Sequence, residues 1–335
     1  MASIDIIVPC YRYAHFLREC VESVLAETSL KVRVLIIDDA SPDNTAEVAA
    51  QLVREDARVN FIRHTVNKRH IATYNEGIDW VTADYLLLLS ADDYLLPNAL
   101  KRAVDYLETH PQVGFTFGKA LISTESGIKT PPAGLGKADL TGSQELSGLE
   151  FIHLIIANKS VNIVPTPSAV VRTALQKRVG GYRPELPHSG DLEMWLRLAA
   201  HGGVGMLNAY QAVWRRHGGN MQLDYYGSDY QLPDLEQRKS AIECFIQACG
   251  LLLPDAPRLR HELLVPLAAE AVAQASRAFN NGDEKMSPQL SQFALSVCPQ
   301  IRSGMQWKQL AFKRFLGVRL WRVLRLALPR IGQKS

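Results

Sequence analysis

The first 118 residues of this 335-residue chain alternate short apolar runs with helical patterns, and this alternation limits the possible folds more than any other feature. Short apolar runs bounded by turn residues are typical of strands buried on both faces. Strands that alternate with helices predict a mostly parallel sheet with helices on both faces, an α/β fold. The expected strands are Ile4–Val8, Val32–Ile37, Val59–Ile62, Tyr85–Leu89 and Val113–Phe117.

Apolar residues at helical spacing occur between the first strands and again near the end of the chain. Apolar residues recur at helical spacing over 16–25 and 48–53, and the polar turn 41–45 can cap the second helix. Residues 119–150 are rich in Gly, Pro, Ser and Thr and should form a loop. Mixed structure is expected over 151–216, with one helix near 192–200, and further helices over 235–252, 258–280, 288–297 and 307–328.

Acidic and polar residues follow three of the expected strands. The segments Pro9-Cys10-Tyr11, Asp38-Asp39 and Asp92-Asp93 each stand at a carboxyl end. Ligands of parallel sheets bind outside these ends, so the three segments should line one crevice. Adjacent carboxylates repel each other unless a cation lies beside them, and a divalent cation on nucleotide phosphates meets that need. The alternative is that Asp92 and Asp93 only open a helix near Pro97, where acids suit the helix dipole.

Charge is unevenly distributed along the chain. The formal net charge is +3, yet 285–335 contains ten Lys or Arg and no Asp or Glu, which leaves 27 basic and 34 acidic residues before it. The chain is therefore an acidic body with a basic tail. Its five cysteines are scattered without metal-ligand spacing, as in reduced cytoplasmic proteins. We find no signal-peptide pattern and no run of about 18 apolar residues, so we expect a cytoplasmic protein.

Five motifs occur in a characteristic order. They are IIVPCYR at 6–12, IIDDASPD at 36–43, SADD at 90–93 with Pro97 beyond, GDLEMWLRL at 190–198 and WRRHGGN at 214–220. Neither GxGxxG after the first strand nor GxxxxGK[ST] occurs, which argues against dinucleotide and P-loop chemistry. Over about residues 3–222 the set resembles glycosyltransferase family 2. The resemblance implies the GT-A fold, a nucleotide-sugar donor and an inverting transfer.

The resemblance also implies contacts with the donor nucleotide. Pro9 and Tyr11 would shape the base pocket, although Tyr11 suits a packed loop equally well. Asp39 matches the carboxylate that accepts the imide N–H of the base, which favours uracil or thymine over cytosine. Asp38 suits either a ligand contact or a turn. Arg69 is either a phosphate contact or a solvated cation.

A metal site is implied beside the donor. By resemblance Asp93 ligates Mn²⁺ or Mg²⁺, and Asp92 reaches the ribose or the metal. His217 would approach the metal or the diphosphate, with a packing role as the alternative. Hard cations of this kind prefer oxygen ligands and neutralise charge on a departing diphosphate. Ser90 stands where many relatives carry a further Asp, which leaves the affinity and identity of the metal open.

Asp191 matches the general base of the family. An inverting transfer needs one carboxylate to take the proton of the attacking hydroxyl. The alternative role of Asp191 is an N-cap of the helix that follows it. Glu193 and Trp195 lie beside it and would shape the acceptor pocket. Further along, Arg215 and Arg216 would suit a phosphate if they face inward.

The basic tail contains an amphipathic pattern. On a helical wheel over 319–328, Arg319, Arg322 and Arg325 share one side, apolar residues occupy the other, and Trp321 lies at the boundary. Helices of this type lie in a membrane interface and are attracted by anionic lipids. The alternative is a helix docked on the protein body. No nucleic-acid-binding motif accompanies the charge, so nucleic acid is not an expected partner.

These patterns predict three segments: a nucleotide-sugar-binding half at 1–118, an acceptor-binding half at 119–232, and a helical region with the amphipathic tail at 233–335. The expected activity is metal-dependent inverting transfer of a sugar from a nucleoside diphosphate, with UDP favoured, to an acceptor hydroxyl. A lipid-linked saccharide of bacterial surface polysaccharide synthesis would explain a tail that contacts the inner face of the cytoplasmic membrane through 302–330. The alternatives are transfer to a protein or soluble acceptor, and a non-catalytic nucleotide-sugar-binding scaffold.

Overall fold

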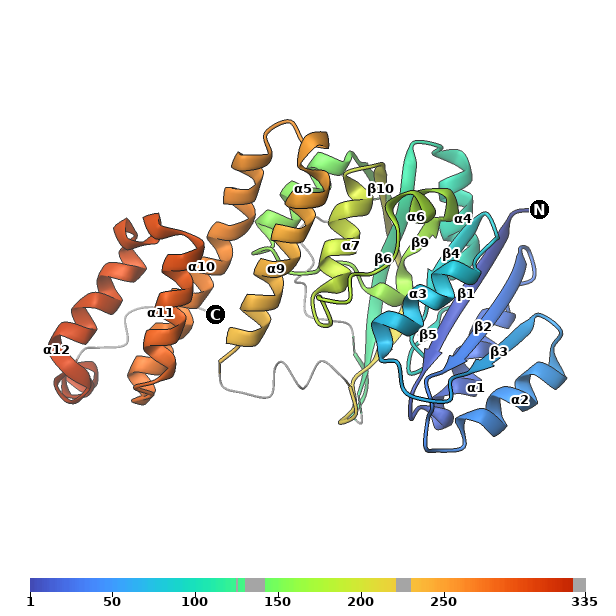
Figure 1. Cartoon of the computed structure of the whole chain (residues 1–335), viewed down its shortest axis with the longest axis horizontal. Coiled ribbons are helices and arrows are strands. Elements are labelled where there is room, and N and C mark those ends of the chain that lie inside the picture. The colour runs from blue at the N-terminus through green and yellow to red at the C-terminus, as the bar shows by residue number, and fades with distance from the viewer. Residues whose placement is uncertain (125, 130–141, 221–229, 328–335) are drawn as a thin grey trace. The chain divides into compact units, whose positions relative to one another are not determined.

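The computed structural model describes residues 1–124, 126–129, 142–220 and 230–327, with only the backbone for 322–327 (Figure 1). The chain divides into two compact units. The first comprises 1–158 with 162–220, and the second comprises 159–161 with 221–335. The helical region expected from 233 onward lies within the second unit.

In the described part of the first unit, ten strands form one mixed sheet, with the order β3-β2-β1-β4-β9-β6-β10-β5 and two strands, β7 and β8, off this path. Strands β1 to β4 are parallel neighbours, and β6 and β10 are also parallel to each other. The strand β9 runs antiparallel between β4 and β6, while β5 and β8 pair antiparallel with β10, and β7 with β6. The bounds are β1 Ser3–Cys10, β2 Lys31–Asp38, β3 Val59–Arg63, β4 Tyr85–Leu88, β5 Tyr94–Leu95, β6 Val113–Thr124, β7 Gly127–Lys129, β8 Gln144–Leu146, β9 Val170–Arg172 and β10 Gly203–Arg215.

Helices cover both faces of this sheet, as the alternation of patterns predicts. On one face, Ile4, Ile6 and Val8 of β1 belong to a core cluster with the apolar sides of α1, α2 and α4. On the other face, α3 approaches β1 so closely that a Cβ at Gly77 would lie 2.2 Å from the Ile7 side chain. The bounds are α1 Ala14–Leu25, α2 Thr45–Glu55, α3 His70–Trp80, α4 Ala99–Thr109, α5 Gly148–Ala157, η1 Thr166–Ser168, α6 Thr173–Val179 and α7 Gly190–Ala199.

The expectation of a loop over 119–150 is wrong where the structure describes it. Strand β6 continues to Thr124 because β10 pairs with it along most of its length, which satisfies its backbone groups. Helix α5 begins inside the expected loop, because Ser147 and Glu150 form a reciprocal capping box. Residues 130–141, including the expected Pro131-Pro132 turn, lie outside the described residues.

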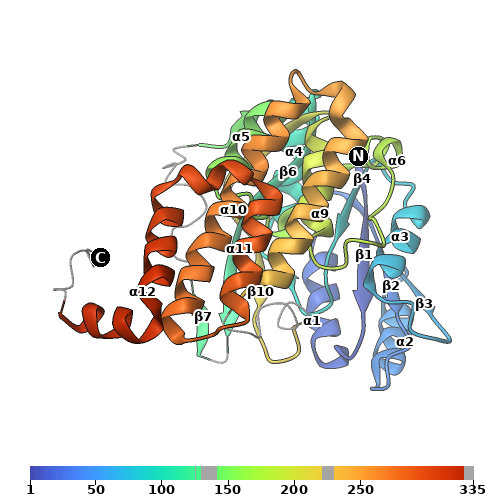
Figure 2. The ribbon, with the colours of Figure 1, turned by 60° about the vertical axis from the view of Figure 1, so that its left-hand side comes forward.

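The second unit is helical, as predicted. Its elements are α9 Leu232–Cys249, η2 Gly250–Leu252, α10 Ala256–Asn281, α11 Met286–Val297, η3 Pro299–Ser303 and α12 Met305–Ala327. Helices α11 and α12 both pack against α10 (Figure 2). A buried Arg238 pairs with Asp234 and with Glu270, at 2.8 Å in each case, which compensates its charge inside the unit.

Helix α12 docks in part on its own unit. Leu310 is buried, Arg314 donates to the Ser287 carbonyl oxygen, and the Trp321 Nε1–H donates to Asn280 Oδ1 at 2.8 Å. Trp321 is therefore held by α10. A non-helical Gly317 (φ 77°, ψ 158°) interrupts the helix. None of the described helices is long and apolar enough to cross a membrane.

Candidate active site

The carboxyl ends of β1, β2 and β4 lie side by side at one edge of the sheet (Figure 1). Cys10 at the end of β1 is in register with Asp38 at the end of β2. The Asp39 N–H donates to the Cys10 carbonyl oxygen at 3.0 Å, and the Ala91 N–H donates to the Pro9 carbonyl oxygen at 3.3 Å. Because these bonds join all three segments, the residues predicted to line one crevice do share one edge.

Asp39 is buried, and one of its two carboxylate oxygens makes hydrogen bonds. Its Oδ1 lies 2.7 Å from His64 Nδ1 and accepts the Lys68 N–H at 2.7 Å. The other imidazole nitrogen of His64 lies 3.0 Å from Glu76 Oε2, so the ring bridges two carboxylates. Sequence reasoning missed His64, although it directly follows β3. This bridge holds Asp39 and the following loop in place beside the strand ends.

The neighbouring nucleotide-site candidates differ in their exposure. Asp38 is fully buried: its Oδ1 accepts the Ser41 N–H at 2.8 Å, and its Oδ2 lies 3.3 Å from Arg63 Nε. These contacts match the turn role that the sequence left open. Pro9 is half-buried, whereas Tyr11 is exposed, with the Arg12 guanidinium 5.0 Å from its ring centroid.

Arg69 stands at the N-terminus of α3 in a backbone conformation that favours glycine. Its φ is 68° and its ψ is 160°, a region in which a non-glycine residue costs about 1–3 kcal/mol. The Asn67 side chain supports this turn, because its Oδ1 accepts the Arg69 N–H at 3.0 Å. The Arg69 side chain is exposed. A cation is therefore presented beside the first turn of a helix, where backbone N–H groups also attract anions.

Asp92 and Asp93 are both buried next to each other. Asp92 Oδ2 lies 3.2 Å from His217 Nε2 and accepts the Asn220 amide at 3.1 Å. Asp92 Oδ1 is buried without a hydrogen-bond partner among the described residues. Asp93 Oδ1 accepts the Arg215 N–H at 3.0 Å. Burial raises the pKa of Asp93 well above its ordinary value, and the adjacent charge of Asp92 adds to the rise.

This pair fits a divalent cation. An unpaired buried oxygen beside a second buried carboxylate and an imidazole is a donor set that Mn²⁺ and Mg²⁺ accept. Within the described residues, no three His, Cys, Asp or Glu side chains form a complete metal-binding group. Oxygens of a bound diphosphate would add to the ligands of such a cation, as is common for Mg²⁺ in phosphate-binding enzymes.

Arg215 and His217 are held by aromatic and acidic partners. The Arg215 guanidinium lies 4.8 Å from the Phe16 ring centroid and 4.5 Å from that of Tyr94, and it pairs with Glu19. This buried guanidinium braces the acidic pair rather than facing a phosphate, because its Nη1 donates to the Asp92 carbonyl oxygen. Arg216 is exposed and lies over Trp214. His217 contacts Tyr13 edge-on, with 5.3 Å between ring centroids.

Asp191 lies in the first turn of α7 and not at its N-cap, which is Ser189. Its Oδ2 accepts the Thr166 hydroxyl at 2.9 Å, and its carboxylate also accepts the Tyr182 hydroxyl. Burial raises the pKa of Asp191 above its ordinary value, while the bonds from Thr166 and Tyr182 act in the opposite direction. The residue as a whole is half-buried. A carboxylate with a raised pKa suits a general base.

The charges of the acidic groups influence the pKa values of two aromatic residues of α3, Tyr74 and His70. Burial raises the pKa of the Tyr74 hydroxyl, and the charges of Asp191, Asp92 and Asp93 raise it further. Burial lowers the pKa of His70, whereas Asp191 and Asp39 both act to raise it. All four carboxylates therefore lie within electrostatic reach of one helix face. No motif in the sequence points to Tyr74, Thr166 or Tyr182, because their role depends on packing between distant segments.

The expected acceptor-pocket roles of Glu193 and Trp195 are wrong. Glu193 is fully buried and pairs with Arg197 at 2.9 Å and with Arg183 at 2.9 Å. Trp195 is 3% exposed and stacks on Phe115 in the core. Both residues follow Asp191 on α7, but the helix turns these side chains into the protein.

The sequence and the fold both match known proteins. A model of the family Glycosyl transferase family 2 matches residues 5–175. EpsE of Bacillus subtilis (strain 168) is 25% identical over 219 residues, which span 63% of this chain and 72% of EpsE. EpsJ of the same organism is 28% identical over 152 residues, spanning 45% of this chain and 43% of EpsJ.

Two solved structures share the fold at low sequence identity. S. aureus TarS 1–349 in complex with UDP-GlcNAc aligns over 98% of this chain and 93% of its own, with a TM-score of 0.68 and 16% identity. The mannosyltransferase PcManGT from Pyrobaculum calidifontis, in complex with GDP-Man and Mn²⁺, aligns over 97% of this chain and 87% of its own, with a TM-score of 0.54 and 15% identity. The family model covers half of the chain and the fold is of the GT-A type, so this chain belongs to glycosyltransferase family 2 and is a glycosyltransferase.

Proposed function

We propose that this glycosyltransferase is a metal-dependent inverting enzyme that moves a sugar from UDP to an acceptor hydroxyl. The observation that carries the proposal is the buried pair of Asp92 and Asp93, with its unpartnered Asp92 Oδ1, together with a separate carboxylate, Asp191, that the Thr166 hydroxyl holds. An inverting transfer needs a charge-neutralising site for the leaving diphosphate and one carboxylate for the acceptor. Asp92 and Asp93 provide the first, and Asp191 provides the second.

On the donor side, each residue has a separate task. Pro9 and Tyr11 flank the base, and Asp39 accepts its imide N–H, which favours uracil over cytosine. Asp38 keeps the turn beneath Asp39 in place. A bound Mn²⁺ or Mg²⁺ would be held by Asp93 with His217, and it would neutralise charge on the departing diphosphate. Asp92 contacts the ribose or the same cation.

On the acceptor side, Asp191 takes the proton of the attacking hydroxyl. The attack inverts the anomeric carbon because the hydroxyl and the leaving diphosphate lie on opposite faces of the sugar. Hydrogen bonds from the Thr166 and Tyr182 hydroxyls hold this carboxylate in place for the acceptor. No second catalytic acid is required when the charge of the leaving group is already neutralised.

The UDP site is tested by calorimetric titration of UDP with and without Mn²⁺, in the wild type and in Arg69→Gly. We expect UDP to bind more tightly with Mn²⁺. Arg69→Gly should weaken UDP binding about tenfold, since a charged hydrogen bond to phosphate contributes about 1.5–3 kcal/mol. The same variant should unfold at a higher temperature, because glycine relieves the strained backbone.

Lys159→Gly is the matched control, because Lys159 also has a positive φ, of 63°, but lies in the second unit. It should relieve strain without changing UDP affinity. If Arg69→Gly binds UDP as tightly as the wild type does, Arg69 is a solvated cation and not a phosphate contact. Tight UDP binding without turnover of any UDP-sugar would favour the non-catalytic scaffold.

For the acceptor, we propose a lipid-linked saccharide of bacterial surface polysaccharide synthesis, used at the inner face of the cytoplasmic membrane. The support is an exposed stripe on α12. Met305, Phe312 and Phe315 are 70%, 58% and 86% exposed, and Lys308 shares their helix face at the i, i+3, i+7, i+10 positions. The stripe lies on the first half of α12 rather than over 319–328, where side chains beyond Trp321 fall outside the described residues.

Cosedimentation with lipid vesicles tests this contact. We expect binding to vesicles that contain phosphatidylglycerol and weak binding to pure phosphatidylcholine, since anionic lipid contributes about 1 kcal/mol per nearby cation. The double variant Phe312→Ser and Phe315→Ser should reduce binding at least ~tenfold. Leu251→Ser is the control, because Leu251 is an exposed apolar residue outside the stripe. Unchanged binding of the double variant would instead favour a protein or soluble acceptor.

A further inference from the structure

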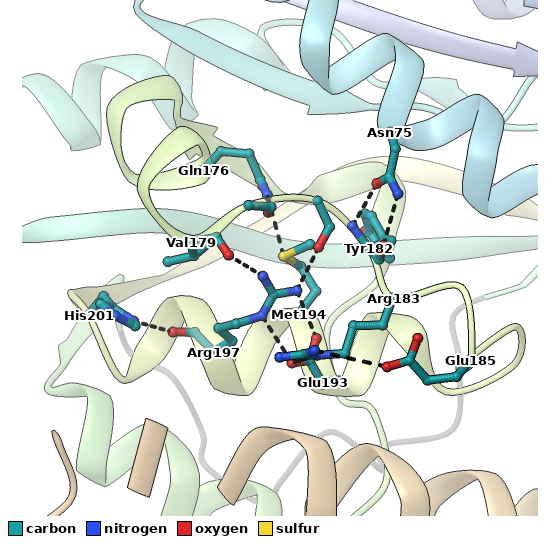
Figure 3. A network of polar contacts seen from close by, with 12 residues as sticks. Asn75, Gln176, Val179, Tyr182, Arg183, Glu185, Glu193, Met194, Arg197 and His201 are labelled. Atoms are coloured by element: carbon teal, nitrogen blue, oxygen red, sulfur yellow. Dashed lines mark hydrogen bonds and ion pairs between the residues drawn. The ribbon is translucent and has the colours of Figure 1, made fainter. Parts of the chain in front are cut away.

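The loop between α6 and α7 is held by a buried ion-pair network (Figure 3). The Arg197 guanidinium donates to the Val179 carbonyl oxygen and, at 2.8 Å, to the Gly181 carbonyl oxygen. Glu193 is fully buried and accepts two bonds from Arg197, each of 2.9 Å. A buried arginine whose charge is paired can fix backbone carbonyls with little freedom to move. The loop therefore has one defined path from α6 to Tyr182.

A second clamp reaches this loop from α3. The Asn75 amide donates to the Tyr182 carbonyl oxygen at 2.9 Å, and its Oδ1 accepts the Tyr182 N–H at 2.7 Å (Figure 3). The fit leaves no space for a side chain at Gly181, where a Cβ would lie 2.3 Å from Asn75 Oδ1. Both backbone polar groups of Tyr182 are thus fixed by one amide.

The side chain of Tyr182 lies between α3 and Asp191. Its ring is 5% exposed and meets the Tyr74 ring edge-on, with 5.4 Å between centroids. A Cβ at Gly190 would lie 3.3 Å from the Tyr182 ring, so the start of α7 packs tightly against it. The Tyr182 hydroxyl donates to the Asp191 carboxylate. Backbone, ring and hydroxyl are therefore all constrained, and the hydroxyl ends on the proposed base.

We propose that Tyr182 is a positioning residue, whose hydroxyl fixes the direction of the Asp191 carboxylate. This inference rests on the proposed role of Asp191 as the general base. The other groups that face Asp191 are the Thr166 hydroxyl from η1, His70 and Tyr74 from α3, and His188 from the loop. The Thr166 hydroxyl also donates a hydrogen bond to Asp191, at 2.9 Å.

The pH profile of kcat/KM in Tyr182→Phe tests the proposal, with release of UDP from the best UDP-sugar as the readout. Phenylalanine keeps the ring packing and removes only the hydroxyl. A hydrogen bond donated to a carboxylate lowers its pKa, so its loss should move the acid limb of the profile to higher pH. We expect kcat on the plateau to fall about tenfold, with the KM for the donor unchanged.

Tyr85→Phe is the matched control. Tyr85 is also buried and its hydroxyl also bonds a carboxylate, that of Glu108, but Tyr85 lies in β4, where its hydroxyl bonds Glu108 and Arg172 instead of Asp191. Tyr85→Phe should leave the acid limb of the kcat/KM profile at the same pH as in the wild type. If Tyr182→Phe also leaves this limb at the same pH and keeps the wild-type kcat, the positioning role is overturned.

A double-mutant cycle on thermal unfolding gives a second readout that needs no activity. At pH 7.5, Tyr182→Phe should lower the unfolding temperature of the wild type by about 2 °C or more beyond the amount by which it lowers that of Asp191→Asn. The reason is that the hydrogen bond from the Tyr182 hydroxyl is stronger to a charged carboxylate than to a neutral amide. Equal effects in both backgrounds would contradict the proposal. If the wild type turns over no nucleotide sugar, the proposed function fails, while this cycle still decides whether Tyr182 acts on Asp191.

Discussion

Asp191→Asn is expected to reduce sugar transfer about 10³-fold while leaving UDP affinity unchanged. Asparagine keeps the shape of the side chain and the bond from the Thr166 hydroxyl, but it cannot accept a proton from the acceptor. General-base contributions are typically about 10²–10⁴-fold, which sets the expected size. Initial rates of UDP release, combined with UDP titration of both proteins, measure the two quantities separately.

Asp79→Asn is the control for this prediction, because Asp79 is an exposed aspartate near the end of α3. It should leave both rate and affinity unchanged. A variant of Asp191 that retains more than about a tenth of the rate would exclude Asp191 as the base. Loss of UDP binding in the same variant would instead place Asp191 in the donor site.

The stability of Asp191→Asn should also depend on pH in a defined direction. The folded pKa of Asp191 lies above its unfolded value, so its contribution to stability is present at low pH and is lost as the pH rises through the folded pKa. At neutral pH the wild type therefore carries a desolvated charge that the variant lacks. The unfolding temperature of the variant should exceed that of the wild type by more at pH 7.5 than at pH 4.

The second large effect is expected for Asp93→Asn. This change should reduce metal-dependent transfer at least ~10²-fold, because neutralisation of the leaving diphosphate supplies several kcal/mol in enzymes of this kind. Mn²⁺ should no longer strengthen UDP binding in the variant. Without metal, however, the variant should be as stable as the wild type or more stable, because one of two adjacent buried charges is removed.

Thermal unfolding with and without Mn²⁺ and UDP measures this effect. Asp105→Asn is the control, since Asp105 lies exposed on α4 and pairs with Lys101. Chelation of divalent ions should reduce wild-type transfer to the level of Asp93→Asn. Full activity of the wild type in chelator would contradict a role for a cation at Asp93.

The parts of the fold that follow local patterns could be predicted from the sequence. Strands β1 to β4 are apolar runs followed by turn residues. Their parallel pairing, and the shared edge of Asp39 and Asp93, follow from the α/β alternation, whereas their order in the sheet does not. The structure of residues 119–150 is harder to predict, because polar and small residues form strands there where β10 supplies the hydrogen-bond partners. Propensity gives way to tertiary context in such segments.

The surroundings of Asp191 could not be predicted for a similar reason. Thr166 and Tyr182 reach it from separate turns, and the loop that carries Tyr182 is held by the buried pair of Glu193 with Arg197. The sequence pattern instead placed Glu193 at an acceptor pocket. The orientation of α12 is a further example. Its amphipathic pattern is visible in the sequence, but the break at Gly317 and the bond from Trp321 to Asn280 depend on packing against α10.

The most direct measurement is the anomalous diffraction of Mn²⁺ in a crystal of the full chain soaked with Mn²⁺ and UDP. We predict one strong peak within coordination distance of an Asp93 oxygen, with UDP phosphates as further ligands and the uracil edge facing Asp39. Asp191 should stand apart from the metal, with free space before its carboxylate. A Mn²⁺ peak elsewhere, or UDP bound away from the ends of β1, β2 and β4, would contradict the account.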